Sequence, residues 1–143
     1  MRFALSLALL VLLANSSMPV APAVPVSKRP ALVVHPRHVR FGHQPFESNT
    51  LRSFRITNTS HETLLVTIEQ VQVGDDFSPG QIESTCALGD TLLPPRQTCT
   101  QVVGFRPTEF FGGFETALMR VIARDDSGQV RYDKLVQLSG TGF

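Results

Sequence analysis

An all-β fold is the class that the sequence predicts, on three observations. From Leu32 onward, apolar and polar residues alternate in short runs, which is the periodicity of half-buried strands. Glycine, proline, asparagine and aspartate interrupt these runs at short intervals, as turn residues do. No segment after residue 23 has an apolar stripe of useful length at helical spacing. Seven short strands in a chain of this size predict a β-sandwich of immunoglobulin type, with a small closed barrel as the alternative.

The first 23 residues are predicted to be a secretory signal peptide. One basic residue, Arg2, precedes the apolar run 3–14, and the segment ends in the small-x-small triplet Ala-Pro-Ala. That run is short for a membrane-spanning helix, which needs ~20 residues, so stable membrane insertion is not expected and an uncleaved anchor is only the alternative. We expect cleavage after about Ala23 and a periplasmic or secreted protein. The mature chain would have a flexible lead-in over 24–30 and one domain over 31–143.

The strands are expected at seven ranges, each rich in β-branched or aromatic residues. In chain order they are 31–35, 38–42, 50–58, 63–73, 97–105, 115–124 and 130–139. The connections TNTSHE, GDDFSPG, PPRQ and DDSGQ hold the turn residues.

Within the strands, residues of one parity are predicted to fill the core between the two sheets. They are Val39, Phe41, Phe54, Ile56, Leu64, Val66, Ile68, Val103, Phe105, Ala117, Met119, Val121, Val136 and Leu138. Phenylalanine carries the aromatic bulk, because the chain has ten Phe, one Tyr and no Trp. An antibody-like domain would have a buried Trp, so the sequence predicts a different kind of immunoglobulin sandwich.

The charge is balanced overall but uneven along the chain. There are 13 Lys and Arg against 12 Asp and Glu, and signal cleavage would remove one basic residue. Six of the basic residues fall in the range 28–55, which contains one acidic residue, Glu47. We expect acidic segments to lie beside this basic segment in the sheets and to neutralise it. A neutral chain lacks the broad positive field of nucleic-acid-binding proteins, so nucleic acid is not an expected partner.

The two cysteines, Cys86 and Cys99, are predicted to form a structural disulfide. An even pair in an exported chain favours a bridge over a metal site. Zinc would need further ligands, and the sequence has no CxxC or HxxxH spacing. Closing so short a loop would stabilise the fold by ~3 kcal/mol if the effect is entropic. Nothing marks either cysteine as catalytic.

The stretch HPRHVRFGH (35–43) holds three of the four histidines. Side chains alternate between faces in an extended strand, so His38 and Arg40 are expected to face solvent. His35 and His43 share a face, but they would lie ~26 Å apart if the run stays extended. We therefore expect no metal site here and interpret the segment as the solvated face of an edge strand.

No other motif predicts chemistry. The pairs Asp75–Asp76 and Asp125–Asp126 do not continue with the alternating oxygen ligands of a calcium loop. The sequence has neither a GxSxG nucleophile motif nor a phosphate-binding glycine loop. The sequon Asn58–Thr59–Ser60 would matter only in a eukaryotic secretory pathway. We expect no catalytic residues, no metal and no cofactor, and thus no enzyme.

The connection PTEFFGGF (107–114) is the most distinctive candidate contact site. Its phenylalanines could cap the end of the sandwich, because large exposed apolar patches are uncommon. Alternatively, Phe110 and Phe111 lie together at the surface and anchor a protein partner. A free sheet edge that accepts an extended strand is a second route to binding.

Several short motifs occur in an order that resembles a known family. They are PRHVRFG (36–42), FRITNTS (54–60), GDDF (74–77), LLPPRQTC (92–99), VGFRPT (103–108), FGG (111–113) and LSGTG (138–142). Together they are similar to the ASH family, named from abnormal-spindle, spindle-pole and hydin proteins, and in particular to its exported bacterial "choice-of-anchor D" members.

The resemblance implies a seven-stranded immunoglobulin-like sandwich related to PapD-like chaperone domains and to the major sperm protein. Members of the family bind proteins or build assemblies and have no catalytic residues to carry over. Exported members often share a cysteine pair at the places of Cys86 and Cys99. Gln101 departs from the pattern, since an apolar inward residue would be usual there, and we interpret it as the mark of a local bulge.

These observations predict an exported, non-catalytic binding or assembly module with a protein partner. A periplasmic chaperone or pilus-assembly accessory is one alternative, although such chaperones have two domains and this chain has room for one. A small sandwich metalloprotein is the other, and it would need histidines that cluster in space.

Overall fold

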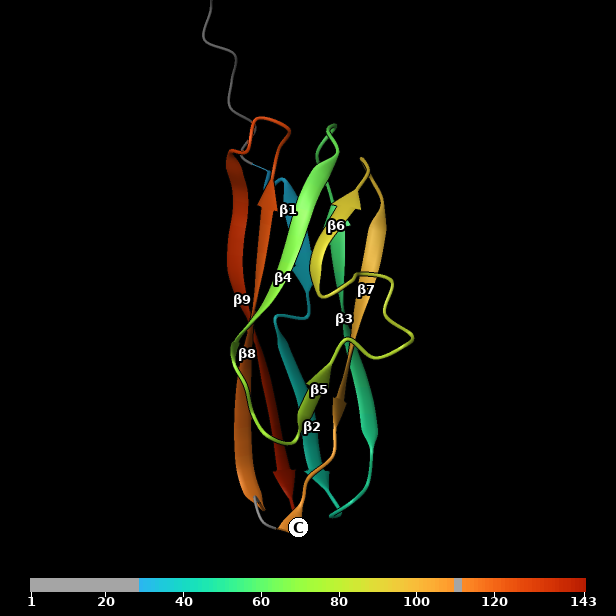
Figure 1. Ribbon diagram of the computed structural model, residues 1–143, viewed down its shortest axis with the longest axis vertical. Helices are drawn as coiled ribbons and strands as arrows, with labels where there is room; N and C mark the ends of the chain where they lie inside the picture. Colours follow the sequence, from blue (N-terminus) through green and yellow to red (C-terminus); the bar gives the residue numbers. More distant parts are fainter. Residues whose placement is uncertain (1–28, 110–111) are drawn as a thin grey trace, which may run out of the picture.

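The chain forms two packed β-sheets in the computed structural model, which describes residues 29–109 and 112–143 (Figure 1). The strands of these residues are β1 (Leu32–His35), β2 (His38–Gln44), β3 (Thr50–Asn58), β4 (Leu64–Gln72), β5 (Phe77–Pro79), β6 (Gly89–Leu93), β7 (Thr98–Phe105), β8 (Gly113–Arg124) and β9 (Val130–Gly142). One sheet has the order β1-β3-β7-β5, and the other has the order β2-β9-β8-β4-β6. The all-β sandwich is confirmed.

Three of the predicted features lie outside the described residues. They are the signal peptide (1–23), most of the lead-in (24–30), and the pair Phe110 and Phe111. Among the described segments, none is a helix long and apolar enough to cross a bilayer.

The predicted count of seven strands is wrong, because the described part of the chain has nine. The two additional strands are β5 and β6. β5 has only three residues and ends at a proline, so the sequence GDDFSPG had the composition of a turn. β6 begins at a glycine with positive φ and offers only five residues of alternation. Both lie at the ends of their sheets, on the same narrow side of the sandwich.

The first strand of the sandwich is divided between the two sheets. β1 pairs antiparallel with β3, and after the cis peptide between His35 and Pro36 the chain continues as β2, which pairs parallel with β9. β1 and β2 are therefore both edge strands, and the prediction of an edge strand over 38–42 is confirmed. The crossing between the sheets decides how much of β9 is covered, as described below.

Every predicted inward residue is buried, and the core also contains residues that the prediction did not name: Leu32, Val34, Phe77, Cys86, Leu93 and Cys99. At its lower end the rings of Phe41, Phe77 and Phe105 form a cluster, with centroids 4.8–5.7 Å apart. Gly140 of β9 lies directly against this cluster, because an added Cβ would stand 2.5 Å from the Phe105 ring. The first glycine of the terminal LSGTG motif is thus explained by packing, because a side chain at this position would clash with the Phe105 ring.

Gln101 is an inward core residue in regular pairing, so the expected bulge is not there. It is fully buried and lies opposite Phe54 in an unbroken β3–β7 register. Its amide nitrogen donates to the Ser84 hydroxyl (3.2 Å) and to the Val102 carbonyl (3.1 Å), while its amide oxygen has no partner. The polar side chain is tolerated because one half of it is hydrogen-bonded to the loop before β6.

Candidate binding edge

The upper part of β9 has a free edge. β9 pairs with β8 from Val130 to Gly142, but β2 covers its other side only from Gln137 onward. The Gln137 N–H donates to the Arg37 carbonyl (2.8 Å), so the main-chain groups of Gln137 point toward β2. Because these groups alternate along a strand, those of Leu135 and Asp133 point the same way, where the described residues place no strand. We call this segment, Arg131 to Leu135, the β9 edge.

The outer face of the β9 edge carries Asp133 and Leu135. Leu135 is 47% exposed, which is high for a leucine in a strand. Asp133 accepts two hydrogen bonds from Arg120 of β8, at 2.8 and 2.6 Å. This pairing lowers the pKa of the Asp133 carboxyl, chiefly through the hydrogen bonds to the guanidinium. The charge of Asp133 is therefore already compensated within the fold.

The inner face of the β9 edge carries Tyr132 and Lys134. Both have the parity of the buried Val136, and Tyr132 packs against the core. Burial raises the pKa of the Tyr132 phenol. Lys134, in contrast, is exposed, because no strand of its own sheet lies beyond it. An inward-facing lysine at a strand edge discourages indiscriminate pairing with other sheets.

An open hollow of ≈ 550 Å³ lies beside the β9 edge. It is lined by Arg37, Val71, Arg120, Asp133, Lys134 and Leu135. Arg37 comes from the crossing between β1 and β2, and Val71 comes from β4, so the hollow spans the outer face of the five-stranded sheet. Its lining combines exposed apolar side chains with cationic ones, which suits an amphipathic ligand better than a purely apolar one.

The basic segment is not neutralised by acidic strands, so that expectation is wrong. Ion pairs of the described residues join Arg106 with Glu47, Arg120 with Glu69 and Asp133, and Arg131 with Glu62 and Asp125. Seven exposed cationic side chains of the described residues take part in none of them: Arg29, Arg37, Arg40, Arg52, Arg55, Arg96 and Lys134. We call five of these, Arg37, Arg40, Arg52, Arg55 and Lys134, the basic side.

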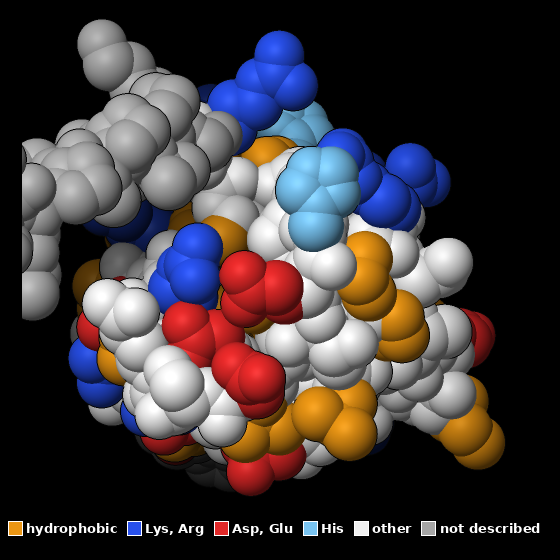
Figure 2. Space-filling view, turned by 90° about the horizontal axis from the view of Figure 1, so that it is seen from above, with side chains coloured by type: hydrophobic (Ala, Val, Ile, Leu, Met, Phe, Trp, Pro, Cys, Tyr) orange, Lys and Arg blue, Asp and Glu red, His pale blue; other side chains and the backbone are white. Residues whose placement is uncertain are grey.

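The basic side follows the narrow side of the sandwich where β1 and β2 lie. Arg37 and Arg40 belong to the crossing and to β2, and Arg55 pairs with His35 of β1. Arg52 lies on β3 just beyond the end of β1, where β3 has no neighbour on that side. Seen from above, Lys, Arg and His side chains lie together at the upper right of the molecule, and further Lys and Arg side chains lie at the left and beside a group of acidic side chains near the centre (Figure 2).

The three early histidines do not converge. His35 and His43 are exposed, while His38 is half-buried and its Nε2 lies 2.9 Å from the Ser139 hydroxyl. His38 is thus less solvated than predicted, although its neighbour Arg40 is exposed as expected. In the described ranges, no three His, Cys, Asp or Glu side chains gather in a way that could hold a metal ion.

The two aspartate pairs hold turns. Asp125 closes the DDSGQ turn, because one carboxylate oxygen accepts from Ser127 and Gln129 and the other accepts from Arg131. The Ser127 hydrogen bond is the main cause of the lowered pKa of Asp125. Asp76 accepts from the N–H (3.0 Å) and the hydroxyl of Thr108 (3.2 Å). Neither pair presents the set of free oxygens that calcium needs.

Glu115 is an unusual carboxyl on the inner face of β8. Burial, followed by its contact with Asp76, raises the pKa of Glu115 from 4.5 to about 7. One of its oxygens is buried without a hydrogen-bond partner. This pair lies between β8 and the segment before β5.

The sequon asparagine has a structural role. Asn58 is fully buried, and its amide nitrogen donates to the carbonyls of Glu62 (2.7 Å), Leu93 (2.8 Å) and Pro94 (3.1 Å). Its amide oxygen accepts from Ser60. The amide that a glycosyl transfer would modify is therefore enclosed and used within the fold.

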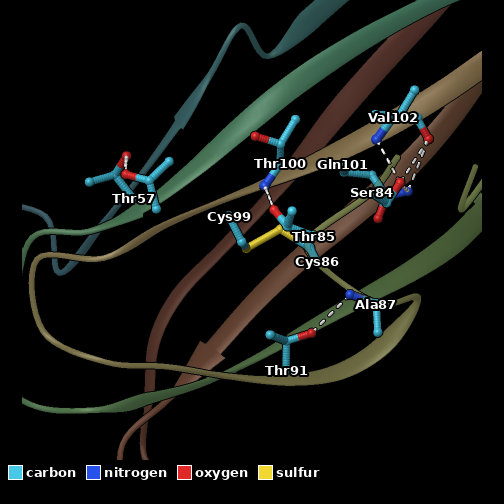
Figure 3. Close-up of a disulfide and its surroundings, with 11 residues drawn as sticks. Thr57, Ser84, Thr85, Cys86, Ala87, Thr91, Cys99, Thr100, Gln101 and Val102 are labelled. Atoms are coloured by element: carbon cyan, nitrogen blue, oxygen red, sulfur yellow. Dashed lines mark hydrogen bonds between the residues drawn. A yellow bond between two sulfur atoms is a disulfide. The ribbon is translucent and has the colours of Figure 1, made fainter. Parts of the chain in front are cut away.

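The disulfide between Cys86 and Cys99 is present and joins the loop after β5 to the start of β7, with the Cα atoms 5.2 Å apart (Figure 3). The N–H groups of Thr85 and Cys86 both donate to the Thr100 carbonyl, at 2.8 and 3.0 Å. The Ser84 hydroxyl accepts from the Val102 N–H (2.9 Å). The loop thus covers the edge of β7 above β5, and we call this the braced side.

The comparisons with known proteins give the fold. No family model and no curated protein matches the sequence. Among solved structures, the ASH/PapD-like domain 7 of human CEP192 matches with a TM-score of 0.66 and 14% identity, over 88% of this chain and 96% of that one. The VesB protease of Vibrio cholerae matches with a TM-score of 0.60 and 16% identity, and the YadV chaperone with 0.56 and 13%.

The match to each of the last two covers 78% of this chain but only 32% of the protease and 52% of the chaperone. At such identities a likeness shows the fold alone. The ASH/PapD-like immunoglobulin fold is therefore confirmed, whereas the narrower choice-of-anchor D type is not part of what these structures show.

Proposed function

We propose that this ASH/PapD-like sandwich is an exported, non-catalytic binding module that adds an extended segment of a partner protein to its β9 edge. The observation that carries the proposal is the β2–β9 pairing, which begins only at Gln137, so that no strand of the described residues covers the main-chain groups of Asp133 and Leu135. Strand addition of this kind supplies affinity through main-chain hydrogen bonds and specificity through alternate side chains.

The shape of the site fits a strand of limited length. An added strand would take the place above β2 and in line with it, so Arg37 would stand at its lower end. On the outer face its side chains would meet Leu135 and the hollow, and on the inner face they would meet Tyr132 and Lys134. The exposed Leu135 is the natural apolar contact, because burying it would add to the main-chain hydrogen bonds.

The test removes one main-chain donor from the β9 edge. Leu135→Pro deletes an N–H that points away from β8, and an edge position tolerates proline. Leu135→Val changes the side chain but keeps the N–H. Cross-linking capture from the producing cells should give a partner with the wild type and with Leu135→Val, and lose it with Leu135→Pro at an unchanged melting temperature. Equal capture by a folded Leu135→Pro protein would refute the edge.

Export is part of the proposal. The signal-peptide pattern over 1–23 supports it, and so does the disulfide, since such bonds persist in oxidising compartments. The intact mass of the protein from the periplasm or medium should correspond to a chain that begins near Val24. Recovery of the full-length chain from the cytosol with both thiols free would contradict export.

A chaperone is the second candidate function, supported by the likeness to the YadV chaperone. A chaperone would take up a strand of an unfolded subunit and keep that subunit from aggregating. Light scattering of a refolding pilus-type subunit with and without this protein separates the two functions. Suppressed aggregation that Leu135→Pro abolishes would favour the chaperone, whereas unchanged aggregation would favour binding of a folded partner.

The end loop offers a second contact route, through the predicted anchors Phe110 and Phe111. The double variant Phe110→Ala/Phe111→Ala belongs in the same capture experiment. Loss of the partner in this variant and its retention in Leu135→Pro would move the contact from the sheet edge to the loop 107–114.

A further inference from the structure

We infer that the segment taken up at the β9 edge is acidic. The inference rests on the binding function proposed above and names the chemistry of the partner. Three features carry it: the ion pairs around the edge, the direction of Lys134, and the position of Arg37 and Arg40 relative to an added strand.

The first feature is an excess of positive charge at the hollow beside the edge. Its lining contains the cations Arg37, Arg120 and Lys134 against the single anion Asp133. Arg120 and Asp133 neutralise each other through two hydrogen bonds. Arg37 and Lys134 remain, and neither forms an ion pair with any described residue. Arg37 at the hollow and Lys134 on the opposite face of the β9 edge together create a local field that favours anionic ligands.

The second feature is where Lys134 stands. It has the inward parity of Val136, yet it is exposed because the sheet ends there. An added strand would pass directly over its stem. A basic or purely apolar segment would leave the ammonium group repelled or stripped of water, which is unfavourable. A Glu or Asp at the facing position of the added strand would satisfy the ammonium group, and this is how a charged edge can exclude most strands and still admit one kind.

The third feature is the arrangement of the remaining cations. Arg37 and Arg40 lie at and below the point where the added strand would end. The lower end of the strand would thus lie beside two cationic side chains. Charge complementarity of this extent sets partner choice and the rate of encounter more than the final affinity.

Nucleic acid fits this surface less well. Single strands bind through basic grooves with aromatic platforms for the bases. Here the single aromatic side chain of the β9 edge is Tyr132, which packs against the core. The unpaired main-chain groups of Leu135 and Asp133, in contrast, suit a polypeptide.

Two labelled ten-residue peptides provide the experiment. Both alternate valine with threonine, and three threonines are replaced by glutamate in one peptide and by lysine in the other. Fluorescence anisotropy with the full mature protein at about 0.1 M salt should show the glutamate peptide binding more tightly, by about tenfold or more. The preference should shrink as salt is raised, because exposed charges are screened.

A charge-reversal pair locates the preference. Lys134→Glu should abolish or invert it. Arg96→Glu makes the same change in net charge at an exposed turn before β7 and should leave the preference intact. A preference that Lys134→Glu leaves unchanged would overturn the inference. So would a (dT)10 oligonucleotide that binds more tightly than the glutamate peptide and is insensitive to Leu135→Pro, because the ligand would then be a nucleic acid.

The two proposals can fail separately. Equal binding of both peptides that is lost in Leu135→Pro overturns the acidic preference and leaves strand addition standing. Binding of the glutamate peptide that survives Leu135→Pro overturns strand addition at this edge. Absence of binding by either peptide overturns the acidic preference, and capture of the natural partner then decides strand addition alone. A homodimer that Lys134→Glu dissociates and that neither peptide competes with would identify a second copy as the occupant.

Discussion

Each of the two narrow sides of this sandwich has an incompletely paired strand edge, and the two sides protect that edge differently. Each has a strand whose edge is only partly covered by its neighbour: β9 above β2 on one side and β7 above β5 on the other. On the braced side, the loop before β6 covers the β7 edge with two main-chain N–H donors, the Ser84 hydroxyl as an acceptor, and a disulfide. On the basic side, the β9 edge has no such cover among the described residues and is flanked by unpaired cations.

The difference indicates that the braced side contributes to the stability of the fold, whereas the basic side leaves a strand edge accessible to a binding partner. A covalently held loop removes an edge permanently from the reach of other chains. Charge protects an edge only conditionally, because an oppositely charged strand removes the protection when it binds. Variants on the braced side should therefore change the free energy of unfolding, and variants on the basic side should change association.

Removal of the disulfide should have the largest effect. Cys86→Ala/Cys99→Ala opens a loop of 13 residues and should lower the free energy of unfolding by roughly 3 kcal/mol, as urea titration would show. Below the new melting temperature, binding at the β9 edge should be unchanged. A loss of stability below about 1 kcal/mol would mean that the hydrogen bonds of the loop, and not the covalent bond, hold the braced side.

Asn58→Ala should have the next largest effect. The substitution leaves the buried carbonyl of Leu93 and the part-buried carbonyl of Pro94 without their donor, at the upper end where β6 leads into β7. Such losses cost about 1–3 kcal/mol. Thermal unfolding would measure the effect, with Ser60→Ala as the milder control, since the Ser60 hydroxyl is only part-buried. A stability equal to that of Ser60→Ala would contradict the structural role assigned to the sequon.

The Glu115 carboxyl should make the stability of the domain depend on pH. The pKa of Glu115 is raised from 4.5 to about 7, so between these values the native state holds a proton that the unfolded state has lost. The free energy of unfolding should therefore fall as the pH rises through this window. Glu115→Gln should flatten the profile and raise stability at pH 8, whereas the exposed control Glu83→Gln should do neither. A profile that Glu115→Gln leaves unaltered would refute this assignment.

The smallest effect on stability is expected on the basic side. Lys134→Val should change the free energy of unfolding by no more than about 0.5 kcal/mol, because the side chain is exposed and forms no ion pair with any described residue. It should, however, increase self-association, since it removes the charge that discourages pairing of the β9 edge with another chain. Sedimentation velocity at rising concentration would measure this. A monomer at all concentrations would show that Lys134 does not discourage this pairing.

The positions of most strands could be predicted from the sequence, but which strands pair with each other, and in which register, could not. Alternation placed seven strands and the whole inward set from Val39 to Leu138, because burial of one face leaves a period of two in the residues. β5 and β6 were too short to leave that signal.

The β9 edge left no signal in the sequence at all. It exists because the chain crosses between sheets at Pro36, so that β2 begins only opposite Gln137, and pairing register is a property of the folded state. Likewise, the composition of residues 28–55 showed an excess of basic residues. Only the topology shows that, among the described strands, no acidic strand lies beside them.

The crossing at Pro36 also has a mechanical consequence. β2 and β9 run parallel and share six pairs of residues, from His38–Gln137 to Gln44–Gly142. Tension that draws the start of β1 away from the end of β9 would act lengthwise on this ladder, so its hydrogen bonds would resist together instead of opening one by one. A partner tethered at either end of the domain could therefore pull on it in the direction in which the sandwich yields least.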